Sequence, residues 1–440
     1  MKNRNGRLRF PNPNSAPLHH KLSRLWTNNN TMVLFAYEGV LIAFINNLIN
    51  NNNNLFATRL GASDFQLTLI IALPQLVGML VLLPGGILTD RMSNKKRMVI
   101  FSLSVLLVVY FVLGFVPFLG KYSLTAFLVL LAISVGPMTM YNASWQAYFS
   151  DVVPIKERNR AFTLRTKWTF LVNIGTPLLT GILLASAAST SGKIRLHQSF
   201  FWLSCILILL QILTLKRISG GTAHVHSSVN LSELGAAAKA LVHNKAFLGF
   251  LAVALLFYMS WQIDWTLYYI GQVKYLKLNE AWLSYCNVGG AAMQLLTIGF
   301  WSRINEKHGI RFSIIMGGLG LCFFPLAMII STSLPANVGP YIFFLLSTAS
   351  NFGFATVSLN ILQCLLQVIP EKNKTLSISI YTLFISFSNA FMPMVGVKVY
   401  TVFGADLRAL HITFFIIFAA RIISTSLWAF RWWLLRNEPK

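Results

Sequence analysis

Three charged residues stand inside long apolar runs of this 440-residue sequence, namely Glu38, Asp264 and Arg421. A charge at the centre of a helix in lipid costs about 2.5–3.5 kcal/mol, so each such residue marks a candidate functional position. A carboxyl group there can take up a proton from one side of a membrane and release it to the other. We therefore expect Asp264 and Glu38 to carry protons, with a structural, hydrogen-bonded acid as the alternative for each. For Arg421 we expect an ion pair or a side chain that reaches the headgroups.

Amide and aromatic side chains recur in the same apolar runs and could line a binding cavity. Asn46 and Asn50 fall on one helical stripe of an asparagine-rich run. Amides donate and accept hydrogen bonds, as hydroxylated or zwitterionic solutes require, and aromatic faces hold sugars, aromatic compounds or cations. A frayed helix end would also explain the run from Asn50, and ordinary packing would explain any one aromatic residue. The candidate cavity residues are Asn46, Asn50, Tyr141, Asn142, Trp145, Trp261, Gln262, Asn287, Gln294 and Asn351.

The elements that carry these residues are predicted to be membrane-spanning helices. The chain is 55% hydrophobic and 11% charged, whereas an average soluble domain is about 25% charged. A helix needs about 20 apolar residues to cross the bilayer core. We predict an all-α membrane protein with twelve transmembrane helices. The twelve apolar runs lie near 31–57, 65–88, 98–118, 123–149, 161–187, 198–215, 247–271, 281–301, 312–331, 338–363, 375–400 and 408–430.

The longest polar interruption, from Lys216 to Lys245, divides the runs into two sets of six. About three quarters of the 36 Lys and Arg residues fall in segments on the side of the N-terminus, which predicts that both termini are cytoplasmic. This bias accounts for the net charge of +24 without nucleic acid as a partner. We expect an N-terminal tail (1–30), a first six-helix half (31–215), a central loop (216–246), a second half (247–430) and a C-terminal tail (431–440).

The two halves repeat one another. Pro154 and Pro370, Asn173 and Asn389, and Pro177 and Pro393 recur at one constant spacing. Two similar halves in the same orientation suit a transporter that rocks one half against the other.

The segment from Gly86 to Arg97 carries the most specific motif. It contains Gly86-Ile-Leu-Thr-Asp90-Arg91 and ends in Lys-Lys-Arg97, and it resembles the G-x-L-x-D-R-x-G-R-K/R signature of the major facilitator superfamily, with Ser93 where Gly is usual. The resemblance implies that superfamily's fold, a monomer with two pseudo-symmetric halves around a central cavity. It also implies that Gly86, Asp90, Arg91 and Arg97 form a conformational latch. A solvated basic loop is the alternative for this cluster.

A second motif lies in the fifth apolar run. Gly175, Pro177 and Gly181 partly resemble the glycine-proline motif of drug/proton antiporters, although Thr176 and Thr180 replace two usual glycines. We interpret these residues, together with Pro393, as positions of helix kinking and close packing.

These patterns together predict a secondary active transporter. We expect a small organic solute to cross the cell (cytoplasmic) membrane by alternating access, with H⁺ preferred over Na⁺ as the coupling ion. Proton-antiport export of drugs or other amphipathic compounds is the alternative. A polytopic membrane enzyme is disfavoured because His, Asp and Glu do not cluster. We expect no cofactor and no metal, since the sequence has no nucleotide-binding Walker motif and no CxxC spacing among its four cysteines.

Overall fold

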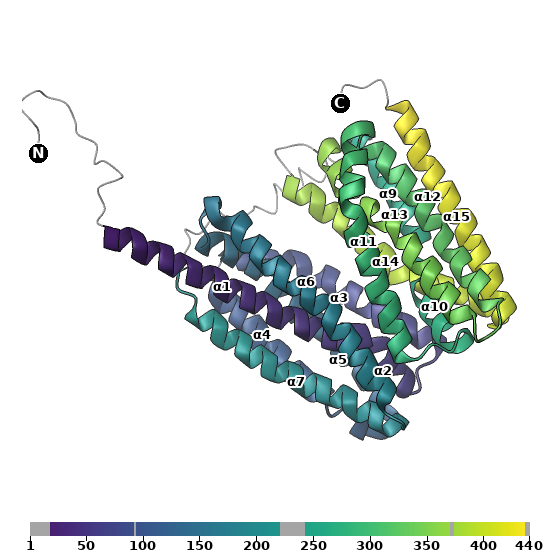
Figure 1. Cartoon of the computed structure of the whole chain (residues 1–440), viewed down its shortest axis with the longest axis horizontal. Helices are drawn as coiled ribbons and strands as arrows, with labels where there is room; N and C mark the ends of the chain where they lie inside the picture. The colour runs from purple at the N-terminus through teal and green to yellow at the C-terminus, as the bar shows by residue number, and fades with distance from the viewer. Residues whose placement is uncertain (1–17, 92–93, 221–242, 370–373, 436–440) are drawn as a thin grey trace, which may run out of the picture.

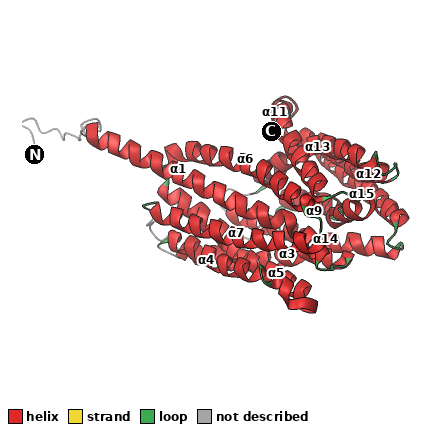
Figure 2. Cartoon of the chain, turned by 60° about the horizontal axis from the view of Figure 1, so that its bottom comes forward, coloured by secondary structure: helices red, strands yellow, loops and turns green. Residues whose placement is uncertain are grey.

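Helices account for all regular secondary structure in the described part of the chain. The computed structural model describes residues 18–91, 94–220, 243–369 and 374–435. No strand occurs among these residues, as Figure 2 shows. The predicted all-α class is confirmed.

The first half comprises α1 (Leu18–Ile49), η1 (Asn50–Asn52), α2 (Asn53–Arg59), α3 (Asp64–Arg91), α4 (Lys95–Leu113), η2 (Val116–Tyr122), α5 (Ser123–Val152), α6 (Ile155–Ser186) and α7 (Thr190–Arg217). The second half comprises α9 (Lys245–Gln262), α10 (Trp265–Ile270), η3 (Gly271–Tyr275), α11 (Glu280–His308), α12 (Ile310–Thr332), α13 (Gly339–Val368), α14 (Lys374–Val402) and α15 (Leu407–Leu434). The first helix thus begins at Leu18, within the segment that the sequence assigns to the N-terminal tail.

Each predicted span coincides with one helix or with a series of consecutive helical segments. Among the described residues, 11 of these are long and apolar enough to cross a membrane. The predicted span near 281–301 lies in α11, which is 29 residues long but is not among the 11. Its apolar character is diluted by polar residues such as Ser284, Asn287 and Gln294, which line a cavity.

Polar side chains fix where several helices begin. In each case a side-chain oxygen at the N-cap accepts a hydrogen bond from a backbone N–H in the first turn, which would otherwise lack a partner. The Asp406 cap of α15 is the shortest of these, with its oxygen 2.7 Å from the nitrogen of Ala409. The other capping residues are Asn94, Ser189, Asn244 and Asn279.

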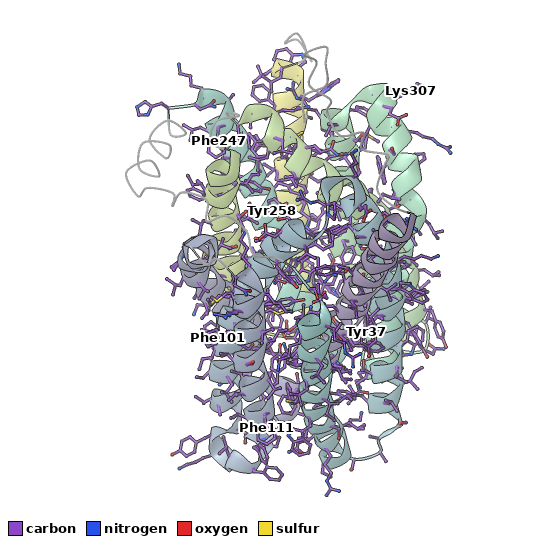
Figure 3. All side chains as sticks on the ribbon, turned by 90° about the vertical axis from the view of Figure 1, so that its left-hand side faces the viewer. Tyr37, Phe101, Phe111, Phe247, Tyr258 and Lys307 are labelled. Carbon is purple, nitrogen blue, oxygen red and sulfur yellow. The ribbon has the colours of Figure 1, made fainter. Side chains whose placement is uncertain are left out.

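The helices form two bundles that converge at one end. Figure 1 shows α1–α7, coloured purple to teal, in one bundle and α9–α15, coloured green to yellow, in the other. The bundles meet near α2 and α10 and diverge toward the end where α1 begins and α15 ends. We call the converging end the far end and the diverging end the terminal end. In Figure 3, Phe247 and Lys307 lie near the terminal end and Phe111 lies near the far end.

The outer surface of the bundles is apolar. Phe101 and Phe111 of α4 are 59% and 50% exposed, and Leu296 of α11 is 78% exposed. An apolar exterior of this extent suits lipid as the surrounding solvent.

Two pairs of long helices make most of the contacts between the halves in the described part of the chain, α6 with α11 and α3 with α14. In the first pair, a Cβ added at Gly181 would overlap the Ser284 side chain and would lie 2.8 Å from the carbonyl oxygen of Glu280. The absence of a side chain at Gly181 therefore allows this close approach. At Gly175, in contrast, an added Cβ would have nothing within 4 Å.

Candidate functional site

A cavity of about 420 Å³ lies between the two halves. The first half contributes the asparagine-rich segment around η1 and part of α6, and the second half contributes α9–α13 and α15. The candidate cavity residues that line this central cavity are Trp261, Asn287, Gln294 and Asn351. The charged residues Asp264 and Arg421 and the proline Pro177 line it as well.

A second cavity, of about 530 Å³, lies between α3, α5 and α14. Asn50 and Asn142 line this lateral cavity, and Asn54 lines both cavities. The asparagine run is therefore neither a plain helical stripe nor a frayed end. It is a helical break, in which α1 ends at Ile49 and a short 3₁₀ turn leads into α2.

Hydrogen bonds between amides and backbone carbonyls stabilise this break. The Asn52 amide donates to the carbonyl of Leu48 at 2.9 Å, and the Asn51 amide donates to the side-chain oxygen of Asn47 at 2.8 Å. Asn47 in turn donates to Asn173 of α6 at 2.7 Å, which ties the break to the neighbouring helix. Amides here replace helical hydrogen bonds that the 3₁₀ turn disrupts.

Four predicted cavity residues line neither cavity: Asn46, Tyr141, Trp145 and Gln262. Tyr141 and Trp145 belong instead to a buried cluster around Glu38 within the first half. Gln262 is 1% exposed at the end of α9.

The carboxylate of Glu38 is fully buried and has three partners from three other helices. The Tyr141 hydroxyl donates to Oε1, and the Gln211 amide donates to the same oxygen at 2.8 Å. Arg165 of α6 donates through Nε to Oε2 at 3.4 Å. Both carboxylate oxygens accept hydrogen bonds, and neither cavity reaches them. The Glu38 carboxylate therefore connects α1 to α5, α6 and α7.

Arg165 is held in place by two further neighbours. Its guanidinium carbon lies 4.0 Å from the centroid of the Trp145 ring, a cation–π contact. Its aliphatic stem crosses the backbone of α1 at Gly39, where an added Cβ would lie 2.5 Å from Cγ. Sequence patterns alone do not single out Arg165, because it follows the basic segment 156–160, where a positive charge is expected in a loop. The adjacent Glu38-Gly39 pair was the available signal.

Asp264 lies at a break in the seventh span, between the end of α9 at Gln262 and the start of α10 at Trp265. Its Oδ2 accepts a hydrogen bond from Nη2 of Arg421 at 2.6 Å, and both side chains are buried. Arg421 therefore forms an ion pair, one of the two alternatives expected from the sequence, and does not reach toward the headgroups.

The remaining donors of Arg421 serve backbone carbonyls. Nε and Nη2 donate to the carbonyls of Ser260 and Trp261 at the end of α9, at 3.2 and 3.1 Å, and Nη1 donates to Leu321 at 2.8 Å. A helix that stops inside a membrane leaves such carbonyls without partners. Arg421 thus neutralises Asp264 and caps the broken helix at once.

Charged residues also bridge the halves at the far end. Arg59 of α2 pairs with Glu280 of α11 and contacts His197, and Nζ of Lys193 lies 2.8 Å from Oε1 of the same glutamate. Asp64 and Lys274 form a looser pair at 3.6 Å. Hydropathy alone assigns Arg59, Lys193 and Lys274 to loops, because each lies near the end of an apolar run.

A comparison with family models identifies the chain. Residues 35–393 match the model of the Major Facilitator Superfamily. The chain belongs to this superfamily. It is therefore a secondary transporter and a multi-pass membrane protein, not an enzyme. No curated protein sequence matches it.

Solved transporters share the fold of this superfamily member. The nucleoside transporter NupG is 12% identical, with a TM-score of 0.70 over 92% of this chain and 99% of that one. A POT family transporter in complex with 5-aminolevulinic acid is 12% identical, with a TM-score of 0.67 over 89% and 94%. A D-xylose-proton symporter is 14% identical, with a TM-score of 0.60 over 93% and 97%. At these identities the likeness concerns the fold.

The superfamily signature lies at the terminal end of the transporter. The surroundings of Gly86 and the side chains of Asp90 and Arg91 lie outside the described part of the structure, whereas Arg97 is exposed in the first turn of α4. Its neighbour Lys95 pairs with Asp151 of α5 at 3.0 Å, and Lys96 donates to the carbonyl of Ile218 at 2.7 Å. These described contacts stay within the first half. No metal-binding group of three or more His, Cys, Asp or Glu occurs among the described residues.

Proposed function

We propose that this transporter moves a small organic solute through the central cavity by alternating access, coupled to H⁺. The observation that carries the proposal is the position of the cavity. It lies between two halves that are bridged by ion pairs at the far end and diverge at the terminal end (Figure 1). In such an arrangement, rocking the halves would break the far-end bridges and bring the terminal ends together.

Asp264 is our preferred proton carrier. It lines the central cavity, its Oδ1 has no hydrogen-bond partner among the described residues, and its charge is balanced by one arginine. A proton needs only one lone pair, whereas Na⁺ would have to bind next to the guanidinium of Arg421 and would be repelled by it. Glu38 is the second candidate. Its contacts favour a structural role, because proton exchange there would require its hydrogen bonds to the neighbouring helices to break.

The bias of basic residues supports an orientation. We propose that the terminal end, with both chain termini, faces the cytoplasm of a cell membrane. The halves then correspond to residues 31–215 and 247–430, and the present conformation is open toward the inside. We propose a monomer, since the cavity draws its lining from the two halves of one chain.

Export of amphipathic compounds by proton antiport is the second candidate. The aromatic corner of Trp261, Trp265 and Phe354 in the cavity wall favours it. Symport and antiport move protons in opposite directions relative to the solute, so one assay separates them.

The test is proton movement in proteoliposomes that contain the purified protein. Sugars, nucleosides, amino acids, organic acids and cationic drugs are applied to the wild type and to Asp264→Asn, Glu38→Gln and the control Glu306→Gln, which removes an exposed acid of α11. We expect a pH change with one compound class, which Asp264→Asn abolishes and Glu306→Gln retains. Solute uptake without proton movement in the wild type would overturn coupling, and no solute movement across the panel would overturn the proposed function.

A further inference from the structure

We propose that the central cavity selects a neutral, hydroxyl-bearing ring solute, of the kind that a free sugar and a nucleoside share. This inference rests on the proposed function and names the substrate class of the same site. Three features of the cavity carry it: its balanced charges, its unpaired acceptors and its aromatic wall.

The charged groups of the cavity are already neutralised within the protein. Arg421 uses four of its five N–H donors for Asp264 and three backbone carbonyls. Glu280, the other acid in the lining, is paired with Arg59 and Lys193. An anionic solute would therefore find only one N–H donor left on Arg421, a cation whose charge is already balanced by Asp264. A cationic solute would find no carboxylate without a counter-charge. A charged solute would lose its hydration without an ionic partner in return.

Most of the buried polar atoms in the lining that lack a hydrogen-bond partner among the described residues are acceptors, and the exception is the hydroxyl of Tyr268. Oδ1 of Asp264, Oε2 of Glu280 and Oδ1 of Asn54 are buried and have no hydrogen-bond partner among the described residues. The two acids are 0% and 7% exposed. A buried acceptor without a partner is costly, so a solute that brings hydrogen-bond donors is favoured. Hydroxyl groups supply donors without adding charge.

The cavity lining combines an aromatic group with several amides. The rings of Trp261 and Phe354 lie 5.0 Å apart at 48°, and Trp265 stands edge-on to Trp261. Gln294 donates to Asn351 at 2.9 Å, and Asn287 is exposed with no hydrogen bond among the described residues. A ring solute offers a flat C–H or base face to the aromatic corner and a hydroxyl edge to the amides.

The volume of the cavity agrees with this class. At about 420 Å³ it falls in the lower part of the range of roughly 300–1,000 Å³ for small-molecule sites. One ring or two linked rings fit such a space, whereas a long amphipathic compound would have to extend beyond it.

The test measures binding by isothermal titration to the purified full chain, independently of proton movement. Two matched sets are used: glucose, glucosamine and glucose phosphate, and uridine and uridine monophosphate. We expect the neutral member of at least one set to bind at least tenfold more tightly than its charged partners. Binding of only the free sugar or only the nucleoside identifies the source of the ring.

Two outcomes would overturn the inference. The first is a charged member that binds as tightly as its neutral partner. The second is no binding of either set, which rejects the class. The proteoliposome panel would then show separately whether the protein transports another compound, so failure of this inference and failure of the proposed function are distinguishable.

A charge variant makes the test sharper. Asn287→Asp adds a carboxylate without a counter-charge to the cavity wall at nearly constant volume. We expect it to improve glucosamine binding about tenfold relative to glucose. Asn337→Asp, at an exposed position between α12 and α13, is the matched control and leaves the ratio unchanged. An unchanged ratio in Asn287→Asp, with the protein still folded by its thermal unfolding profile, would show that Asn287 does not contact the solute and would overturn the assignment of the amide face.

Discussion

Arg421 of α15 lies beside the break between α9 and α10 and pairs with Asp264 through an Nη2–Oδ2 contact of 2.6 Å. The same side chain caps the carbonyls of Ser260 and Trp261. The break therefore places a buried carboxylate in the cavity wall, while the backbone carbonyls at the end of α9 keep hydrogen-bond partners. Discontinuous helices are a known means of placing a binding site in the middle of a membrane protein.

This geometry predicts that the two residues depend on one another. Arg421→Met would leave a buried carboxylate without its partner and should destabilise the protein by about 3–5 kcal/mol. Adding Asp264→Asn removes that charge and should recover a substantial part of the loss. Thermal unfolding of the purified single and double variants in detergent measures both effects. Equal unfolding temperatures for Arg421→Met and the wild type would contradict the role of the pair.

Gly39 provides the second prediction. The stem of Arg165 crosses α1 at this glycine, where an added Cβ would lie 2.5 Å from Cγ. Gly39→Ala should displace Arg165 from Glu38 and Trp145 and destabilise the first half by about 1–3 kcal/mol, the usual range for overpacking. Gly249→Ala is a matched control in α9, since an added Cβ there has nothing within 4 Å. A lower unfolding temperature in Gly249→Ala would contradict the proposed packing, and so would an unchanged unfolding temperature in Gly39→Ala.

The buried charged residues show what could be predicted from the sequence and what could not. Glu38, Asp264 and Arg421 stand alone in apolar runs, so the cost of charge in lipid identifies them. Their partners do not follow from that rule. Asp264 and Arg421 are 157 residues apart, and only the packing of α15 against α9 joins them. Apolar runs alone therefore predicted the helices and the candidate charges but not the pairing.

A second limit concerns the ends of the apolar runs. Arg59, Arg165 and Glu280 lie next to polar segments, where hydropathy does not distinguish a loop charge from a side chain buried between helices. The asparagine run shows the same limit. Its composition is plain in the sequence. The 3₁₀ turn at Asn50–Asn52, which places Asn50 and Asn51 in the linings of different cavities, and the tertiary contact of Asn47 with Asn173 are not.

The far-end bridge gives the third prediction, on conformational equilibrium. Glu280 forms salt bridges with both Arg59 and Lys193. Glu280→Gln should therefore destabilise the conformation with the far end closed by about 1–3 kcal/mol, the typical effect of losing a charged hydrogen bond. With the four native cysteines replaced, Thr180→Cys in the cavity wall reports opening through labelling by an impermeant maleimide. We expect labelling from the far side to rise several-fold in Glu280→Gln. The control Glu306→Gln should leave the labelling rate unchanged, and no increase in Glu280→Gln would rule out a gating role for the bridge.

Two glycines of α6 provide the last prediction, because they share one motif but differ in surroundings. Gly181 lies against Ser284 and the carbonyl of Glu280, whereas Gly175 has open space. Gly181→Ala should force α6 and α11 apart at the far end and destabilise the present conformation by about 1–3 kcal/mol. Gly175→Ala should change stability by no more than about 0.5 kcal/mol. The Thr180→Cys labelling assay and thermal unfolding measure both variants. If the two glycines respond alike, the motif acts through helix kinking at Pro177 and not through the contact with α11. A loss of stability in Gly181→Ala but not in Gly175→Ala would show that the close packing of the two halves depends on Gly181.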